Sequence, residues 1–321
     1  MVGSDLAILS AFGGAAMRRT AYLTLYWHPQ SPQERTRIRQ QIWEMLERYR
    51  LKTRKFPPDR DFCRLIPLDV DSEKFKHLIE DIEKWREIDD VNLKIWHSYS
   101  SYELSSALLL EWGPTNQAIE DDYYTMHFKK GQAEGISPYT RDCEVCRAPL
   151  EQVRDIWVDT RLMGKRDLSL TYSFEIILSP RLARMLQEAG FTGFTLRPVW
   201  DYRKPYQGEP KLYQLVVTNI LPPMASPPTE FEQAQRCEVC GTKTQYLKHT
   251  HFWGQIKYYE ETEIYYTREV LQHAADFNAT YERIGGLPDG HPLVIISQRV
   301  YEWLKANGIK GWDTRPAYLV E

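Results

Sequence analysis

The chain has 321 residues, of which 42% are apolar and 26% charged, enough for about two globular domains with cores of their own. Its net charge of −3 gives no broad positive field and no polybasic run is present, so the composition argues against binding nucleic acid or a membrane by bulk charge. Residues 1–19 include a short apolar stretch with no basic segment before it, too short to cross a bilayer. We expect a flexible tail there.

Residues 20–117 predict a first domain with two layers, one of strands and one of helices. Ser31-Pro32-Gln33-Glu34 is a capping box that opens an amphipathic helix, and apolar residues at helical spacing predict a second helix at 75–85. Aromatic and β-branched content predicts the strands between them. These are 21–27, 62–70, 91–97 and 102–112, the last two joined as a hairpin.

The pattern breaks near Trp112-Gly113-Pro114, and the acidic run Glu120-Asp121-Asp122 precedes another predicted strand at 123–129. We therefore place a second domain at 122–321. Within it, residues 222–228 (PPMASPP) cannot form a central strand or a helix, because proline lacks the backbone N–H. This loop is expected to lead into the second of two cysteine motifs.

Four of the five cysteines occur in one four-residue sequence that appears twice, Cys143-Glu144-Val145-Cys146 and Cys237-Glu238-Val239-Cys240. Two such Cys-x-x-Cys knuckles can supply the four thiolates of a tetrahedral zinc site. Four thiolates leave no open coordination position, so the expected role of Zn²⁺ is structural, as a staple between distant segments. Redox dithiols or disulfides are the alternative, although turn residues follow each motif where a thioredoxin-like pair would open a helix.

A second repeat aligns residues 177–198 with 295–316. The copies are ILSPRLARMLQEAGFTGFTLRP and IISQRVYEWLKANGIKGWDTRP. Each predicts a strand, a helix with a serine N-cap (Ser179 or Ser297) and an apolar stripe, a glycine C-cap and a further strand. The second domain is thus expected to be a duplicated strand-helix-strand unit, and the fold class of the chain α+β.

The sequence contains no pattern of the common catalytic sites. Glycine-rich phosphate loops, the G-x-S-x-G elbow and the H-E-x-x-H zinc motif are absent. His249 and His251 lie near the second knuckle at strand spacing, but they are surplus to a site with four thiolates. We expect no catalytic residues and no enzymatic activity, with an enzyme of unrecognised site as an alternative.

The two knuckles, the element from Leu178 to Gly193, the segment Leu212-Tyr213-Gln214-Leu215 and the pair Asp276-Phe277 resemble the double-CXXCG motif protein family over about residues 122–321. Several members are bacterial immunity proteins that neutralise contact-delivered swarming-inhibition toxins. The resemblance implies a zinc-stapled protein that binds a protein partner, a toxin encoded nearby. One departure is that Arg147 stands where the first CXXCG motif has glycine, whereas Gly241 keeps the second motif intact.

Two segments, 200–206 and 258–266, combine aromatic side chains with charges and are the expected partner-binding surface. The candidates, chosen by composition, are Trp200, Tyr202, Tyr206, Tyr258, Glu260, Glu261 and Tyr265. Aromatic and arginine anchors dominate protein interfaces, and acidic neighbours would steer a basic partner. For 256–267 a solvated sheet face is the alternative.

The cations and aromatics of 197–206 also suit a zinc-ribbon protein that binds nucleic acid, which is the main alternative function. Paired cysteines at metal-ligand spacing, without a recognisable signal peptide, favour a reducing compartment. We therefore expect a cytoplasmic protein that does not contact a membrane.

Overall fold

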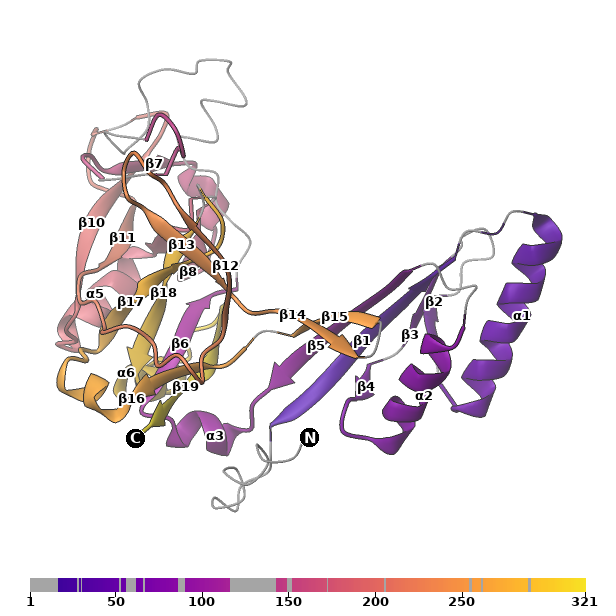
Figure 1. Cartoon of the computed structure of the whole chain (residues 1–321). Coiled ribbons are helices and arrows are strands. Elements are labelled where there is room, and N and C mark those ends of the chain that lie inside the picture. The colour runs from indigo at the N-terminus through magenta and orange to yellow at the C-terminus, as the bar shows by residue number, and fades with distance from the viewer. Residues whose placement is uncertain are drawn as a thin grey trace. The chain divides into compact units, whose positions relative to one another are not determined.

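A computed structural model gives the fold. It describes residues 17–27, 29, 31–51, 53–55, 62–65, 67–85, 90–115, 143–148, 152–171, 173–204, 206–253, 256–260, 262–287 and 290–321. These residues combine helices with strands in three sheets, a mixed fold consistent with the α+β class (Figure 1). The chain divides into two compact units: Met1–Glu103 with Lys248–Thr262 (unit 1), and Leu104–Leu247 with Glu263–Glu321 (unit 2).

Unit 1 is built on β1 (Arg18–Tyr26), which pairs antiparallel with β5 (Asp90–Ser98) on one side and β3 (Phe62–Leu65) on the other. The sheet has the order β14-β15-β5-β1-β3-β2, and β4 also pairs with β1. The remaining strands are β2 (Thr53–Lys55), β4 (Leu68–Asp69), β14 (Thr250–Trp253) and β15 (Ile256–Glu260). Without β14, β15 and the two-residue β4, this is a β-α-β-β-α-β arrangement of the ferredoxin-like kind.

Two helices pack on one face of this sheet. α1 (Pro32–Arg48) follows Ser31, whose hydroxyl accepts a hydrogen bond from the amide of Glu34, as the capping box predicts; α2 (Glu73–Glu83) follows Ser72, which caps in the same way. The apolar sides of both helices and the inward residues of the strands form one core. Its members include Leu23, Leu25, Ile38, Ile42, Leu46, Phe75, Leu78, Ile79, Leu93 and Ile95.

Unit 2 contains two sheets, with the orders β7-β10-β11-β9-β8 and β12-β13-β17-β18-β6-β19-β16. The first comprises β7 (Ile156–Val158), β8 (Leu168–Leu170), β9 (Ile176–Leu178), β10 (Phe194–Asp201) and β11 (Leu212–Val217). The second comprises β6 (Leu109–Pro114), β12 (Phe231–Arg236), β13 (Lys243–Leu247), β16 (Ile264–Thr267), β17 (Phe277–Ile284), β18 (His291–Ser297) and β19 (Trp312–Val320).

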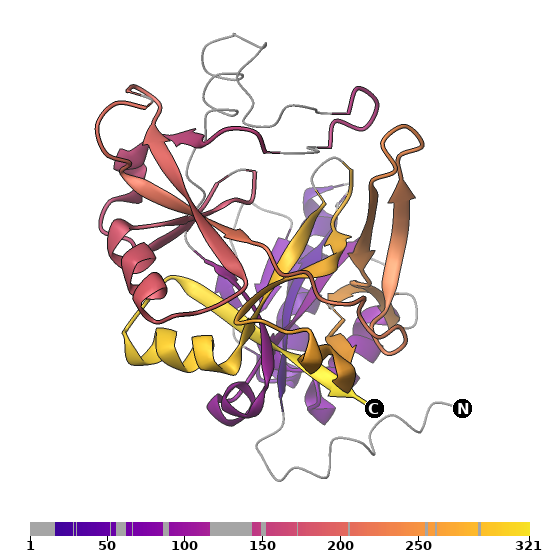
Figure 2. The ribbon, with the colours of Figure 1, turned by 90° about the vertical axis from the view of Figure 1, so that its left-hand side faces the viewer.

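The two sequence repeats fold alike, as β9-α5-β10 and β18-α6-β19, where α5 is Pro180–Glu188 and α6 is Gln298–Ala306. The predicted N-caps are confirmed, because Ser179 accepts a hydrogen bond from the amide of Leu182 and Ser297 from that of Val300. Both helices contribute to one core with residues of both sheets (Figure 2).

The likeness of the halves extends beyond the repeats. Their strand orders correspond, β7-β10-β11-β9-β8 and β16-β19-β6-β18-β17, so β6 occupies in the second half the place of β11 in the first. The registers match too: Leu196 pairs with Leu215, and its counterpart Thr314 pairs with Trp112. In each half an aspartate also binds the N-cap serine of the helix. Asp167 accepts a hydrogen bond from the hydroxyl of Ser179, and Asp276 accepts one from the hydroxyl of Ser297.

The limits of the two units differ from the expected domains. The segment 101–106 is a short helix, α3 (Ser101–Ser106), and β6 joins a sheet of unit 2, where Leu110 and Trp112 enter the core. The hairpin β14–β15 belongs to unit 1, since β15 pairs in parallel with β5. At the start of the chain, β1 already includes Arg18 and Arg19, while residues 1–16 and the predicted strand at 123–129 lie outside the described residues.

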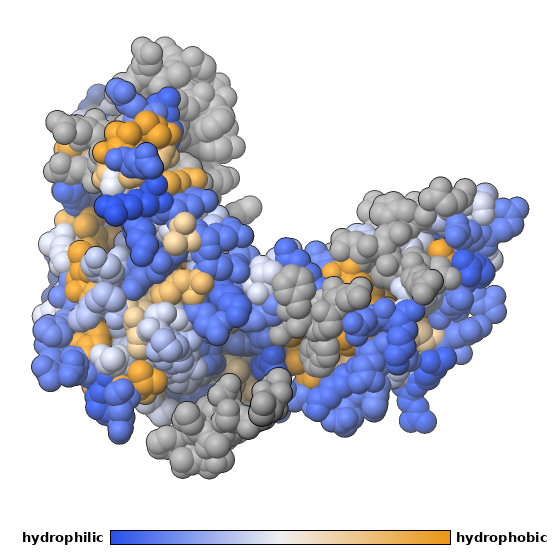
Figure 3. Space-filling model, in the orientation of Figure 1, coloured by the Kyte–Doolittle hydropathy of each residue, from blue (hydrophilic) through white to orange (hydrophobic). Residues whose placement is uncertain are grey.

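None of the described helices combines the length and apolar character needed to cross a bilayer. On the face drawn in Figure 3, hydrophobic residues form separate patches among hydrophilic ones.

Candidate metal centre and aromatic surface

The second knuckle is the turn of the β12–β13 hairpin. The amide of Gly241 donates to the carbonyl of Cys237 at 2.9 Å, and the amide of Cys237 donates to the carbonyl of Thr242 at 2.9 Å. Gly241 has a φ of 74°, in the left-handed region that glycine adopts without steric cost. The backbone thus folds back sharply between the two cysteines and the next strand.

The first knuckle has the same backbone turn. Arg147 donates to the carbonyl of Cys143 at 2.7 Å, and Cys143 donates to the carbonyl of Ala148 at 3.2 Å. Arg147 adopts a φ of 60°, close to that of Gly241. Arginine at the position that glycine occupies in the second knuckle therefore leaves the turn intact, and it places a non-glycine residue in a left-handed conformation, which costs about 1–2 kcal/mol.

The two knuckles lie side by side and bring the four cysteines of the sequence prediction together (Figures 1 and 2). The Sγ atoms of Cys143 and Cys237 are 3.7 Å apart, those of Cys146 and Cys240 are 3.6 Å apart, and all four lie within 4.8 Å of one another. Sulfurs bound at about 2.3 Å to one tetrahedral ion lie roughly 3.8 Å apart, whereas a disulfide needs about 2.05 Å. The cluster therefore fits a metal ion and contains no disulfide.

The surroundings of the sulfurs favour different protonation states. Hydrogen bonds from the amides of Cys146 and Val145 lower the pKa of Cys143. Hydrogen bonding between Cys240 and Thr242, whose Oγ1 lies 3.1 Å from the sulfur, lowers the pKa of Cys240 to about 6. Burial raises the pKa of Cys146 to about 12. A bound divalent cation would favour the thiolate at all four positions, because its charge outweighs these local effects.

His249 and His251 are not part of this cluster. Both belong to the β14–β15 segment of unit 1, where His249 stacks on Tyr259 with 5.9 Å between ring centroids and Nε2 of His251 lies 3.0 Å from the carbonyl oxygen of Glu260. Among the described residues, the cysteines alone form a group suited to a metal ion.

Three candidate partner-binding residues gather at the β7–β10 edge of unit 2. Tyr206 is 51% exposed and lies 5.5 Å from Trp200, measured between ring centroids; Trp200 and Tyr202 are half-buried. The sequence reasoning missed two further members of this group. Tyr206 also meets Trp157 at 5.7 Å, and the guanidinium of Arg154 lies 4.1 Å over the Trp157 ring. We call Arg154, Trp157, Trp200, Tyr202 and Tyr206 the aromatic surface.

The arginines around the aromatic surface are matched by carboxylates. Arg161 binds Asp159, and Arg203 binds both Asp201 and Asp159. The hydrogen bonds from these arginines lower the pKa of Asp159 and Asp201. Both carboxylates are therefore ionised at neutral pH, and the surface carries little net positive charge. The parallel pairing of β7 with β10, which brings Trp157 beside Trp200, involves strands far apart in sequence, so composition alone did not reveal it.

The residues of the second predicted patch are divided between the two units. Tyr258 and Glu260 belong to unit 1 and Tyr265 to unit 2, where Tyr265 is half-buried and stacked on Tyr318 at 5.4 Å. Glu261 and the side chain of Tyr258 lie outside the described residues. Glu260 is only 9% exposed, so the expectation that it steers a basic partner is wrong.

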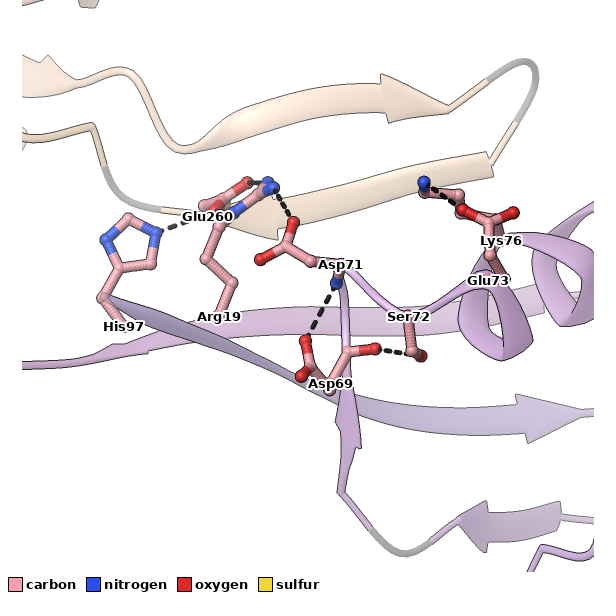
Figure 4. A network of polar contacts seen from close by, with 8 residues as sticks. All are labelled: Arg19, Asp69, Asp71, Ser72, Glu73, Lys76, His97 and Glu260. Carbon is pink, nitrogen blue, oxygen red and sulfur yellow. Dashed lines mark hydrogen bonds and ion pairs between the residues drawn. The ribbon is translucent and has the colours of Figure 1, made fainter. Parts of the chain in front are cut away.

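Glu260 instead binds inside unit 1 (Figure 4). Its carboxylate accepts hydrogen bonds from Nε and Nη2 of Arg19, both at 2.7 Å, and Nε2 of His97 lies 2.7 Å from the same carboxylate. Burial raises the pKa of Glu260, but the hydrogen bonds from His97 and Arg19 outweigh it and hold the pKa at about 2. The side chain points inward because β15 pairs Glu260 with Ile95 of β5, a core residue.

Comparison of the chain with protein-family models and with curated proteins gives no match.

Proposed function

We propose that this chain is a non-catalytic, cytoplasmic protein that binds and blocks a protein partner through the aromatic surface of unit 2. One Zn²⁺ ion, held by Cys143, Cys146, Cys237 and Cys240, fixes the two knuckles. With four protein ligands the ion has no position for a substrate, so its contribution is to folding. The resemblance to double-CXXCG immunity proteins supports a toxin encoded nearby as the partner.

The observation that carries the proposal is the exposed ring of Tyr206 packed between two tryptophans. Tryptophan, tyrosine and arginine are the residues that most often dominate binding energy at protein interfaces. Trp200 is also held in place, since its indole N–H donates to Asp155 at 2.9 Å. A pre-ordered aromatic group loses little conformational entropy on binding, which favours affinity.

Charge favours a protein over a nucleic acid at this surface. Binding to phosphates requires protein cations that can displace the counterions of the nucleic acid. The nearby Arg161 and Arg203 are already paired with Asp159 and Asp201. The rival prediction that segment 197–206 binds nucleic acid is thus the weaker one for unit 2.

The test is direct binding between the purified chain and the co-expressed product of the neighbouring gene, measured by calorimetry. Tyr206→Ala should weaken binding by at least about 2 kcal/mol, a roughly thirty-fold higher Kd. Tyr281→Ala, which removes another exposed tyrosine of unit 2 (65% exposed), is the matched control and should leave the Kd unchanged. Unchanged binding by Tyr206→Ala and Trp157→Ala, with zinc content intact, would overturn the assigned surface.

A further inference from the structure

The sheet of unit 1 has one face packed against α1 and α2 and another that the helices do not cover. Residues alternate between the faces along each strand, so those on either side of the buried Ala21, Leu23, Leu93 and Ile95 point away from the core. We call this second side the open sheet face. Its described side chains are Arg18, Thr20, Tyr22, Thr24 and Tyr26 of β1, Asp69 of β4, Asn92, Lys94, Trp96 and Ser98 of β5, Thr250 of β14, and Lys257 and Tyr259 of β15.

Aromatic rings stand out from this face. Trp96 is 62% exposed and Tyr22 is 43% exposed, and their ring centroids are 6.5 Å apart at an interplanar angle of 78°. On β15, Nζ of Lys257 lies 5.1 Å from the ring centroid of Tyr259. Side chains this exposed bury little apolar area in the core of unit 1. Exposed aromatic side chains that lie together indicate a surface that binds another molecule.

The charges of the open sheet face are mostly positive. Arg18, Lys94 and Lys257 are all exposed, and Asp69, opposite Thr20, is the one acidic residue among its described side chains. The helix-covered face differs, because there Arg19 is paired with Glu260 and Asp71. A sheet face that combines exposed cations with protruding rings suits a flexible polyanion that carries planar groups.

We propose that the open sheet face of unit 1 binds single-stranded nucleic acid, with Trp96 and Tyr22 contacting bases and Arg18, Lys94 and Lys257 contacting phosphates. Aromatic rings on an open sheet stack on the unpaired bases of a single strand, whereas a duplex buries its base faces. This activity is separate from the partner binding assigned to unit 2 and rests on different residues.

The experiment is fluorescence anisotropy on the full-length chain with labelled twelve-nucleotide oligo(dT) and oligo(rU) and a duplex of the same length, at 50 and 200 mM salt. Both single strands, or one of them, should bind more tightly than the duplex, and affinity should fall as salt rises. The two single strands separate a DNA ligand from an RNA ligand. No binding to either single strand at 50 mM salt, or equal binding of the duplex, would overturn the proposal.

Variants separate stacking from nonspecific contact. Trp96→Leu should raise the Kd about tenfold or more, and Trp96→Phe should retain most of the affinity because it keeps an aromatic face. Trp43→Leu, on α1 and 49% exposed, is the matched control and should bind like the wild type. Lys94→Glu should weaken binding and reduce its salt dependence, whereas Lys84→Glu, after α2, should not. Equal losses for Trp96→Leu and Trp43→Leu, or no loss for Trp96→Leu, would refute the site.

Discussion

Glu260 of β15 accepts two hydrogen bonds from the guanidinium of Arg19 of β1, although 241 positions separate these residues. This pair and His97 hold the β14–β15 hairpin on a sheet whose other strands all come from the first hundred residues. The contact thus joins two distant parts of the chain into one unit.

Glu260→Gln should destabilise unit 1 by about 2–3 kcal/mol, because Arg19 and His97 lose their charged acceptor in a buried setting. Chemical denaturation followed by far-UV circular dichroism measures the loss. Glu73→Gln is the control, since Glu73 pairs with Lys76 on the exposed side of α2 and its loss should leave the denaturation midpoint unchanged. An unchanged midpoint for Glu260→Gln would show that the buried pair contributes nothing net.

Because Glu260 is bound by Arg19, we also expect the unfolding free energy of unit 1 to depend on pH. The pKa of Glu260, about 2, lies below that of an ordinary glutamate, so the unfolded chain takes up its proton first as the pH falls. The contribution of Glu260 is therefore complete above about pH 4.5 and is lost as the pH falls towards 2. The difference in unfolding free energy between wild type and Glu260→Gln should shrink over this window. A difference that stays constant from pH 6 to pH 2.5 would contradict the assignment.

Much of the local structure could be predicted from sequence. The helix starts at Ser31, Ser179 and Ser297 depend on residues within one turn, so a local pattern contains the information. The cysteine cluster could also be anticipated, because the spacing within each knuckle already positions two sulfurs.

Strand partners could not be predicted in this way. The segment that forms β6 has the apolar character of a strand, but nothing near it in sequence identifies β18 and β19 as its neighbours. Likewise, the segment of tyrosines and carboxylates around Glu260 has the composition of a solvent-exposed sheet face. Only the pairing of Glu260 with Ile95 shows that its side chain points inward. A shift of one residue would have placed it on the opposite face.

The cysteine cluster predicts one zinc per chain, measured by elemental analysis of the purified protein. Cys237→Ser should lose the metal and destabilise unit 2 by several kcal/mol, since the free energy of metal binding is coupled to folding. Val239→Ser is the matched control, because Val239 lies in the same knuckle and is 68% exposed. Retained zinc and an unchanged melting temperature in Cys237→Ser would rule out the structural role.

Substitutions at Arg147 and Gly241, the left-handed residues of the two knuckles, should change stability differently. Arg147→Gly should keep the zinc and leave stability equal or slightly higher, because relief of the left-handed strain is offset by greater entropy of the unfolded chain. Gly241→Ala should also keep the zinc and cost about 1 kcal/mol, since an added Cβ meets no atom within 4 Å. Loss of metal from either variant would mean that the turns depend on more than backbone conformation.

Two glycines of the first repeat should respond very differently to alanine. A Cβ at Gly193 would lie 2.0 Å from the carbonyl oxygen of Phe277, so Gly193→Ala should cost more than about 3 kcal/mol or prevent folding of unit 2. Gly190 has open space around it, and Gly190→Ala should cost only about 1 kcal/mol for its φ of 66°. Thermal denaturation compares the two, and similar melting temperatures would contradict the close approach at Gly193.

The position of β6 has a consequence for how the chain is made. A ribosome adds about 5–20 residues per second, so Leu110 and Trp112 emerge on the order of ten seconds or more before β18 and β19 exist to cover them. During that time an apolar strand with unpaired edges is available to chaperones or to a second nascent chain. Truncation before β19 would then do more than remove a terminal strand, because it would leave one edge of a strand made some two hundred residues earlier permanently unpaired.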